Sequence, residues 1–215
     1  SAGAETQFDT LVHRWRDDGS AISMETSHGT FTCDRLVIAA GPWAGQMLAD
    51  LGAPLQLRRQ SLFWFEAPAN HSFHKMPPFL FEDPQGAYYG FPATSPFGVK
   101  VGDHGYGQPL ASPEAIDRDI DPSDQQRLEA FVARRLPGVS QSITNHATCY
   151  YTMSPDEHFL VDRLPSDERI CFAAGLSGHG YKFAPVLGEA LADLATEGST
   201  ALPVDFLSAR RFTTH

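Results

Sequence analysis

The sequence predicts an α/β layer combined with an α+β unit that is built around a mostly antiparallel sheet. Two apolar runs that end in glycine, 35–41 and 169–175, are typical of strands buried on both faces of a parallel sheet. Between these runs the chain has longer stretches with strand-like alternation and a Pro-rich loop. We therefore expect three segments, 1–53, 54–153 and 154–215, of which the first and the last form one α/β layer.

Short polar turns delimit the expected strands. Turn residues at Asp17-Asp18-Gly19 and at His28-Gly29 separate three alternating segments, which predict a small meander. The strands of this meander are 11–16, 21–26 and 31–33. The middle of the chain has the pattern of four longer strands, at 57–66, 87–91, 98–102 and 147–152.

Three helices are expected from apolar spacing and from capping residues. A short helix over 43–51 follows the first run that ends in glycine. The second helix, 122–136, has Asp121 or Ser123 as its N-cap and ends at a Pro-Gly pair. The third helix repeats apolar residues at helical spacing over 183–194, and a glycine stands where its C-cap is expected.

The composition is that of an ordinary globular protein with an acidic balance. Hydrophobic residues make up 42% and charged residues 20% of the 215 residues, and the formal net charge is -10. This charge argues against nucleic acid and anionic membrane as partners, because both attract cationic proteins. No stretch approaches the roughly 20 apolar residues that a membrane helix needs.

Cysteine and histidine spacing argues against disulfides and metal sites. Cys33, Cys149 and Cys171 are widely separated and form no CxxC pair. The nine histidines are dispersed without ligand spacing, so we expect no metal. A reducing compartment is the default for such a chain, and we predict a cytoplasmic protein.

The segment 175–183, with the sequence GLSGHGYKF, is the most specific single motif. Three glycines, a serine and a histidine just before a helix give a backbone whose amides can point at an anion or a polar ring edge. Lys182 lies in the first helical turn, where the macrodipole disfavours a cation. It is therefore either a solvated lysine or one that is held for a carboxylate.

The local pattern alone assigns ordinary structural roles to the other candidate residues. Cys149 has a strand-like context and is interpreted as a small buried core residue. Lys100 alternates with two valines and is interpreted as a solvent-facing strand residue. His104, Tyr89 and Tyr151 are interpreted as structural sheet or surface residues.

Four motifs occur together in order along the chain. They are Tyr88-Tyr89-Gly90-Phe91-Pro92, Lys100-Val101-Gly102-Asp103-His104, Cys149-Tyr150-Tyr151-Thr152 through Pro155-Asp156-Glu157-His158-Phe159, and the segment 175–183. In this order and spacing they resemble the monomeric sarcosine oxidase and N-methyltryptophan oxidase group of the D-amino-acid-oxidase-like superfamily. The resemblance covers nearly the whole chain, and four motifs together are far more specific than any one of them.

This resemblance implies a fold and a cofactor. The segments 1–53 and 154–215 would form an incomplete FAD-binding Rossmann-like layer, and 54–153 would form the antiparallel-sheet substrate domain. Cys149 would be the covalent anchor of the flavin, at a position that the family uses for a thioether. The implied cofactor-binding residues in the two glycine-ending turns are Gly41, Gly175, Ser177, Gly178, His179 and Gly180.

The resemblance also implies catalytic and substrate-binding residues. Lys100 would be the oxygen-activating residue, because its positive charge favours the reaction of reduced flavin with oxygen. His104 would lie in the substrate cavity beside the amine. Tyr89 and Tyr151 would border the substrate, and Lys182 would help to bind its carboxylate.

The activity that follows from the resemblance is oxidative demethylation of an N-methyl amino acid with FAD and oxygen. Its products would be the amino acid, formaldehyde and hydrogen peroxide. Sarcosine and N-methyltryptophan are both open as substrates, and the aromatic run Phe63-Trp64-Phe65 favours the larger one. Two alternatives are a binding or scaffold protein that kept the fold without the flavin domain, and a related glycine or D-amino-acid oxidase.

The sequence departs from the family pattern in one large respect. It has no GxGxxG fingerprint, and its opening, without Met and with Gly3-Ala4-Glu5, predicts a C-terminal fragment that lacks the N-terminal FAD-binding segment. We expect this chain alone to hold FAD poorly and to be inactive. Missing first strands would expose apolar surface around 37–40 and 172–174, so self-association or marginal stability is predicted.

Overall fold

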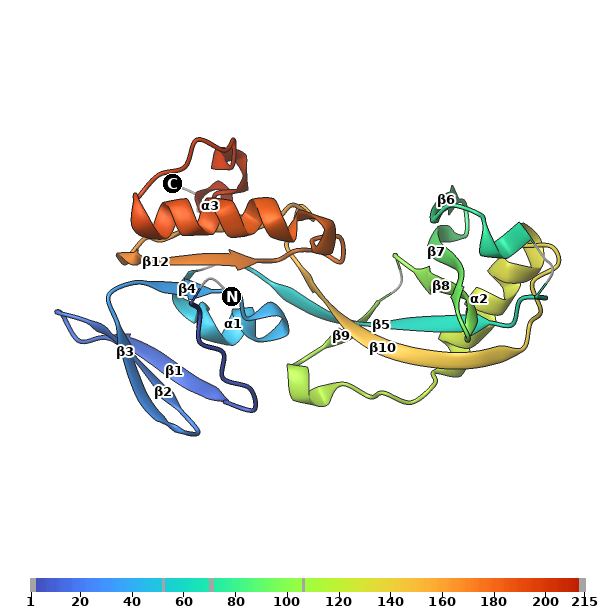
Figure 1. The fold of residues 1–215 in the computed structure, drawn as a ribbon, viewed down its shortest axis with the longest axis horizontal. Coiled ribbons are helices and arrows are strands. Elements are labelled where there is room, and N and C mark those ends of the chain that lie inside the picture. Colours follow the sequence, from blue (N-terminus) through green and yellow to red (C-terminus); the bar gives the residue numbers. More distant parts are fainter. Residues whose placement is uncertain (1–2, 52, 70–71, 106, 213–215) are drawn as a thin grey trace. The chain divides into compact units, whose positions relative to one another are not determined.

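A computed structural model of the chain describes residues 3–51, 53–69, 72–105 and 107–212 (Figure 1). The chain divides into two compact units. Unit 1 contains residues 1–55 and 154–215, and unit 2 contains residues 56–153. The mixture of α/β and antiparallel-sheet elements confirms the predicted fold class.

A three-stranded sheet forms the centre of unit 1. Its order is β11 (Leu160–Leu164), β12 (Asp167–Ala174) and β4 (Leu36–Ile38). Strand β12 pairs with β4 in parallel, as the two glycine-ending runs predict, and pairs with β11 in antiparallel. The parallel pair therefore joins segments that are more than 130 residues apart in the chain.

Strand β12 is buried on both faces. Ile170 and Phe172 pack into the core on the side of β4 and the short helix α1 (Ala44–Met47). Cys171 and Ala173, which alternate with them, pack against helix α3 (Ala184–Thr196), which runs along β12 in Figure 1. A continuous apolar run is what such a two-sided strand needs.

The apolar surface predicted around 172–174 is absent, so this expectation is wrong. Phe172, Ala173 and Ala174 are all buried, because β11 pairs with one edge of β12 and α3 covers one face. The exposure predicted around 37–40 is present at β4, where Val37 keeps 42% of its surface accessible. Self-association stays a prediction.

The remaining elements of unit 1 include the predicted meander. Strands β1 (Val12–Asp17), β2 (Ile22–Thr26) and β3 (Gly29–Cys33) form an antiparallel sheet in that order. The indole Nε1 of Trp15 donates to the carbonyl of Met47 at 2.9 Å and ties this sheet to α1. The 3-10 turns are η1 (Gly41–Trp43), η2 (Ala49–Leu51), η5 (Tyr181–Phe183), η6 (Asp205–Leu207) and η7 (Ala209–Phe212).

The predicted single helix over 43–51 is wrong in detail. It is divided into η1, α1 and η2, because the backbone leaves the helical region at Leu48, where φ is -120° and ψ is 33°. This break lets Leu48 and Leu51 both reach the core. Among the helices of the described residues, none has the length and apolar character needed to cross a membrane.

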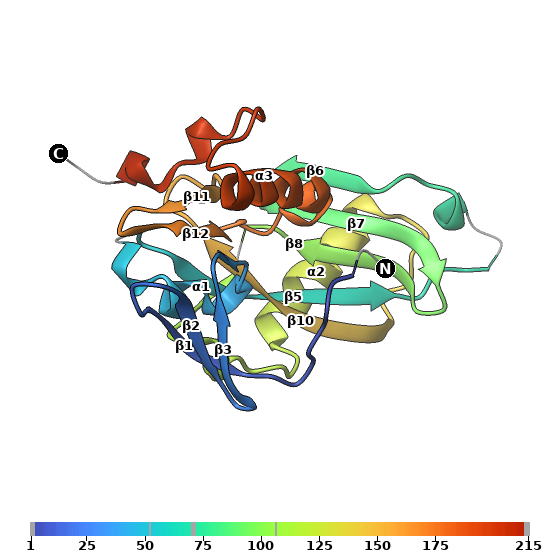
Figure 2. The same cartoon turned by 60° about the vertical axis from the view of Figure 1, so that its left-hand side comes forward.

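Unit 2 is a six-stranded antiparallel sheet with one helix. Figure 2 shows β10, β5, β8, β7 and β6 side by side in that order, and β9 also pairs with β5. The bounds are β5 (Gln56–Phe65), β6 (Phe79–Asp83), β7 (Gly86–Ser95), β8 (Gly98–Asp103), β9 (Gln108–Leu110) and β10 (Ile143–Met153), with 3-10 turns η3 (Ser72–His74) and η4 (Pro113–Ala115). Strands β6 and β9 were not predicted.

Helix α2 (Pro122–Arg135) covers one face of this sheet. Asp121 is its N-cap and accepts from the backbone amides of Ser123 and Asp124, at 2.8 and 3.3 Å. Phe131 stacks on Tyr88 of β7, with ring centroids 4.4 Å apart. The buried core on this face is Phe63, Phe65, Phe73, Tyr88, Ala93, Val99, Val101, Leu128, Phe131, Val132, Leu136 and Val139.

A buried ion pair also joins α2 to the sheet. The guanidinium of Arg59 on β5 lies 2.7 Å from Asp124, and their side chains are 2% and 7% exposed. Arg59 further donates to the carbonyls of Asp117 and Asp119, which hold the segment before α2. A buried charge pair is tolerated only when its hydrogen bonds are satisfied in this way.

Replacing Asp124 with Asn should destabilise unit 2 by about 3–5 kcal/mol, because Arg59 would then be a buried charge without its counter-charge. Urea unfolding measures this loss. The matched control is Glu25→Gln, which breaks the exposed Arg14–Glu25 pair of unit 1 and should leave the unfolding midpoint nearly unchanged. Equal effects of the two substitutions would contradict the assigned role of the buried pair.

Candidate functional site

The face of the unit 2 sheet that points away from α2 contains the candidate residues of this unit. Successive residues of a strand point to opposite faces. Phe63 and Phe65 of β5 pack against α2. Leu62, which precedes Phe63, and Trp64, which lies between the two phenylalanines, therefore belong to the other face. Val99 and Val101 likewise place Lys100 on that other face.

Strand register then brings the predicted residues of unit 2 onto this one face. Residues directly opposite each other in an antiparallel pair share a face. Gly102 lies opposite both Leu62 and Tyr89, which extends the face from β5 to β7. The face, here called the open face, contains the predicted residues Lys100, His104, Tyr89, Cys149 and Tyr151, together with Gln60, Leu62, Trp64, Phe91, Gly102 and Ala147.

Two tyrosines and a histidine contact one another on the open face. The Nδ1 atom of His104 and the hydroxyl of Tyr151 are 3.2 Å apart, and the Tyr89 and His104 rings meet edge to face. Burial raises the pKa of Tyr89 far above its usual value, and the neighbouring Tyr151 raises it further. Burial also raises the pKa of Tyr151, to about 12. Both phenols are therefore neutral hydrogen-bonding groups throughout the working pH range.

Gly102 makes room for one of these tyrosines. A Cβ atom at Gly102 would lie 2.6 Å from Cζ and 2.8 Å from the hydroxyl oxygen of Tyr89. The Tyr89 ring therefore lies across the glycine, in the space that any larger side chain would fill. Glycine at this position is a requirement of the open face and not of a turn.

Cys149 is a free, half-buried cysteine opposite Gln60 on the edge strand β10. Burial raises the pKa of its thiol, while the positive charge of Lys100 acts in the opposite direction. Because the thiolate is the nucleophilic form, these two effects decide how reactive the sulfur is. The interpretation of Cys149 as a core residue on pattern alone is only half right, since it stays partly accessible.

The glycine-rich segment 175–183 forms a tight turn at the end of β12 in unit 1. Gly175 has a φ of +59°, and a Cβ atom there would lie 3.0 Å from Leu55 and 3.1 Å from Leu160. Ser177 is buried with a φ of +47°. Its hydroxyl donates to the carbonyl of Gly175 and accepts from the amide of Ser154, so it holds the turn together.

His179 and Gly180 complete the turn. The Nδ1 atom of His179 is 2.9 Å from the carbonyl of Ser177, and its ring lies 4.8 Å from that of Phe159. Gly180 packs closely on Leu176, with only 2.7 Å between its ideal Cβ position and the Leu176 side chain. Gly178 has a φ of +80°, a conformation that favours glycine.

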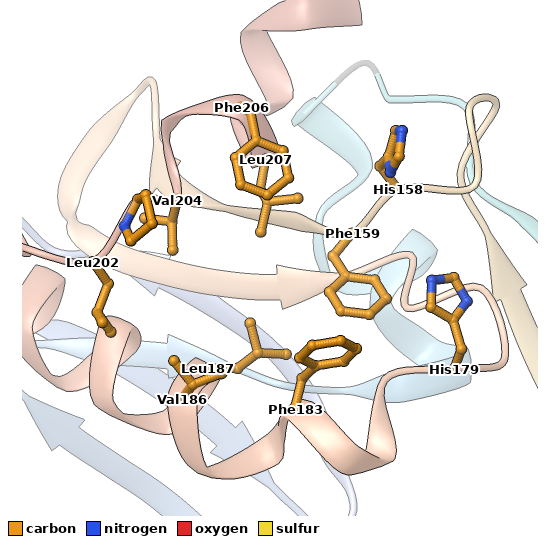
Figure 3. A pocket seen from close by; sticks show the side chains of 11 residues that line it. His158, Phe159, His179, Phe183, Val186, Leu187, Leu202, Val204, Phe206 and Leu207 are labelled. Atoms are coloured by element: carbon orange, nitrogen blue, oxygen red, sulfur yellow. The ribbon is translucent and has the colours of Figure 1, made fainter.

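An apolar cavity of about 380 Å³ lies beside this turn in unit 1. Figure 3 shows His179, Phe159 and Phe183 together at one end of the cavity. The other walls are His158, Val186, Leu187, Leu202, Pro203, Val204, Phe206 and Leu207. Phe183 and Val186, which the helical pattern predicts as apolar positions, are exposed toward it and not buried in the core.

Gly41 and Lys182 are the remaining candidate residues in unit 1. Gly41 begins η1 with a φ of +52°, and a Cβ atom there would meet nothing within 4 Å. Lys182 is exposed, and its Nζ atom is 5.7 Å from the ring of Phe183. The solvated interpretation of Lys182 therefore describes its environment within unit 1.

Asp156 holds a loop of unit 1 in place through several hydrogen bonds. Asp156 accepts from Arg211 at 2.7 Å, from the amide of His158 and from the hydroxyl of Ser154. The Arg211 guanidinium is the main reason why the pKa of this carboxyl lies well below its usual range. A carboxylate held in this way is a structural anion and a poor proton donor.

Gly102→Ala should displace the Tyr89 ring and lower the stability of unit 2 by about 1–3 kcal/mol, because the added methyl group has no free space. Urea unfolding measures the loss of stability. Gly188→Ala is the matched control: its Cβ meets nothing within 4 Å, and alanine in a helix should add up to about 1 kcal/mol. A neutral Gly102→Ala would show that Tyr89 does not occupy this position.

Alkylation of Cys149 should be slow at neutral pH and should accelerate as the pH rises past the usual cysteine range, because burial raises its pKa. Lys100→Met removes the opposing positive charge and should slow the reaction further, by up to about tenfold for one pKa unit. Peptide mass spectrometry separates Cys149 from the other two cysteines. Lys75→Met, which removes an exposed lysine of the same unit, is the control and should change nothing.

Comparison with known proteins gives one consistent group of relatives. The family model described as FAD dependent oxidoreductase (DAO) matches residues 1–194. The monomeric sarcosine oxidase of Streptomyces avermitilis is 37% identical over 97% of this chain and 56% of its own length. The N-methyl-L-tryptophan oxidase of Salmonella dublin is 36% identical over 98% of this chain and 56% of its own length. The chain thus spans about half the length of the curated relatives it matches.

Solved structures share the fold. NikD, an amino acid oxidase essential for nikkomycin biosynthesis, superposes with a TM-score of 0.80 at 25% identity, over 96% of this chain and 56% of that one. Glycine oxidase from Geobacillus kaustophilus superposes with a TM-score of 0.77 at 22% identity, over 100% of this chain and 55% of that one. With residues 1–194 matched, this chain belongs to the FAD dependent oxidoreductase (DAO) family.

Proposed function

We propose that this chain is part of an FAD-dependent oxidase that removes the methyl group of N-methyl amino acids. The observation that supports the proposal best is the open face, on which Lys100, His104, Tyr89, Cys149 and Tyr151 converge from three strands of one sheet. Relatives named sarcosine oxidase and N-methyl-L-tryptophan oxidase supply the substrate class. Bound FAD would accept the electrons of the substrate and pass them to oxygen.

The residues of the open face fit a covalently attached flavin. Cys149 supplies a half-buried free thiol, and the nearby cation Lys100 favours its thiolate form. Attachment through this sulfur would fix the cofactor on β10, the edge strand of the sheet. Lys100 would then contribute positive charge where negative charge develops during the reaction with oxygen, which is the usual electrostatic role of such a group.

The neutral hydrogen-bonding groups of the open face suit substrate binding. Tyr89 and Tyr151 stay protonated and offer hydroxyls in an apolar setting. His104 contacts both tyrosines and would orient the substrate amine. Such a demethylation would consume one molecule of oxygen and one of water, and would yield the free amino acid, formaldehyde and hydrogen peroxide.

Unit 1 would provide further cofactor and substrate contacts. Backbone groups of Gly41, Gly175, Ser177 and Gly178, which have positive φ, and of Gly180, which has no side chain, would face the cofactor, because a ligand can approach the backbone closely there. His179, within the same turn, would contact the cofactor beside them. The Ser177 hydroxyl is used inside the turn, so only its backbone is free for this role. Lys182, exposed beside this turn, would reach a substrate carboxylate.

Sarcosine and N-methyltryptophan are both consistent with these relatives, which are similarly identical to this chain. Trp64 and Phe91 on the open face favour the aromatic substrate, since flat rings pack well on one another. Comparing turnover of the two substrates by the protein from the full-length gene decides between them. If neither substrate led to the formation of hydrogen peroxide, the proposed activity would be contradicted.

Cys149→Ser in the protein from the full-length gene should lose flavin on acid precipitation, whereas the unmodified protein should keep its flavin absorption in the precipitate. The physical reason is that the serine hydroxyl is a far weaker nucleophile than a thiolate. Cys171→Ser is the matched control, because this buried cysteine lies in unit 1 against α3. Retention of flavin by Cys149→Ser would show that the anchor lies elsewhere.

A further inference from the structure

Lys100 lies between two aromatic rings on the open face. Its Nζ atom is 5.4 Å from the centroid of the Trp64 ring and 5.4 Å from the centroid of the Phe91 ring. Both distances are within the roughly 6 Å over which a ring face attracts a cation. Two rings at the same distance hold the ammonium from two sides.

The strand register produces this arrangement. Lys100 is on β8, and its direct partners across the neighbouring strands are Trp64 on β5 and Phe91 on β7. Opposite residues in antiparallel strands have Cβ atoms about 5 Å apart on the same face, so long side chains contact each other. Phe97 also contacts the Trp64 ring edge to face, with centroids 6.3 Å apart.

The charge of Lys100 is not neutralised by these contacts. Within residues 3–51, 53–69, 72–105 and 107–212, no carboxylate oxygen forms an ion pair with its ammonium. On the opposite face of the same sheet, Arg59 and Arg127 are both paired with Asp124. A ring face stabilises a cation through its quadrupole and leaves the net charge in place.

We propose that Trp64 and Phe91 are positioning residues, an aromatic clamp that fixes the Lys100 ammonium on the open face with its full positive charge available. The inference rests on the proposed oxidase function, for which it names two residues that set the place of the cation. The lysine side chain has several rotatable bonds, and it loses this rotational freedom only when its ammonium group is held. The clamp holds the head group without an acidic partner that would cancel its attraction for developing negative charge.

The test uses the chain itself, because it contains only three lysines, Lys75, Lys100 and Lys182. With ¹³C-labelled lysine, NMR shows three sets of side-chain Cε–Hε signals, and Lys100→Met identifies the set that belongs to Lys100. Protons held over two ring faces experience ring currents, so the Lys100 signals should lie upfield of those of the exposed Lys75.

Substitution of either ring should reverse that shift. Trp64→Leu and Phe91→Leu should each move the Lys100 signals toward those of Lys75, and Trp64→Phe should restore most of the shift. Acylation of Lys100, followed by peptide mass spectrometry, should accelerate about two- to fivefold in either leucine variant. Phe81→Leu is the matched control, since Phe81 packs on Phe131 beside α2 and should leave Lys100 unaffected.

Lys100 signals that coincide with those of Lys75, or that ignore both leucine substitutions while the spectra stay folded, would overturn the clamp. If Trp64→Leu fails to fold, the more exposed Phe91 still provides the test. The NMR measurement needs neither flavin nor turnover. The clamp can therefore fail while the proposed oxidase function stands, and an inactive full-length protein can still have a clamped Lys100.

Discussion

The packing of α2 against one face of the six-stranded sheet is the constraint on which the open face depends. The helix buries the phenyl ring of Phe131 against Tyr88 and joins Asp124 to Arg59 in a buried ion pair. Once that face belongs to the core, strand alternation leaves every second residue for the other face. The same alternation that builds the core therefore places the candidate residues on the open face. A change of strand register by one residue would exchange the core residues with the open-face residues.

The electrostatics of the two faces differ in a way that suits their roles. Beside α2, the charges of Arg59 and Arg127 are compensated by those of Asp124 and Asp103, as buried charges must be. On the open face the two tyrosines remain neutral because burial raises their pKa values, and Lys100 is held by aromatic rings. The charges beside α2 thus form ion pairs that stabilise the fold, whereas the cation on the open face stays available to a ligand.

Local patterns predicted some elements well and others poorly. Helix α2 has a capping aspartate, a proline in its first turn and an apolar repeat, all of which act within a few residues, and its limits agree with the prediction. The stretch 43–51 has a helical pattern but breaks at Leu48, because core contacts for Leu48 and Leu51 outweigh a weak local preference. Strands β6 and β9 were missed, since they are short and depend on pairing with β7 and β5.

The sequence by itself determined the fold class, the glycine-ending strands and, through four motifs, the family and the candidate residues. The sequence could not predict the surroundings of these residues, because the local patterns indicate a core residue at Cys149 and a solvent-facing residue at Lys100. Only the tertiary structure decided that Cys149 and Lys100 share a face with Tyr89, and that Trp64 and Phe91 flank the lysine. Pairing between strands far apart in the chain sets these neighbours, and no local interaction encodes that register.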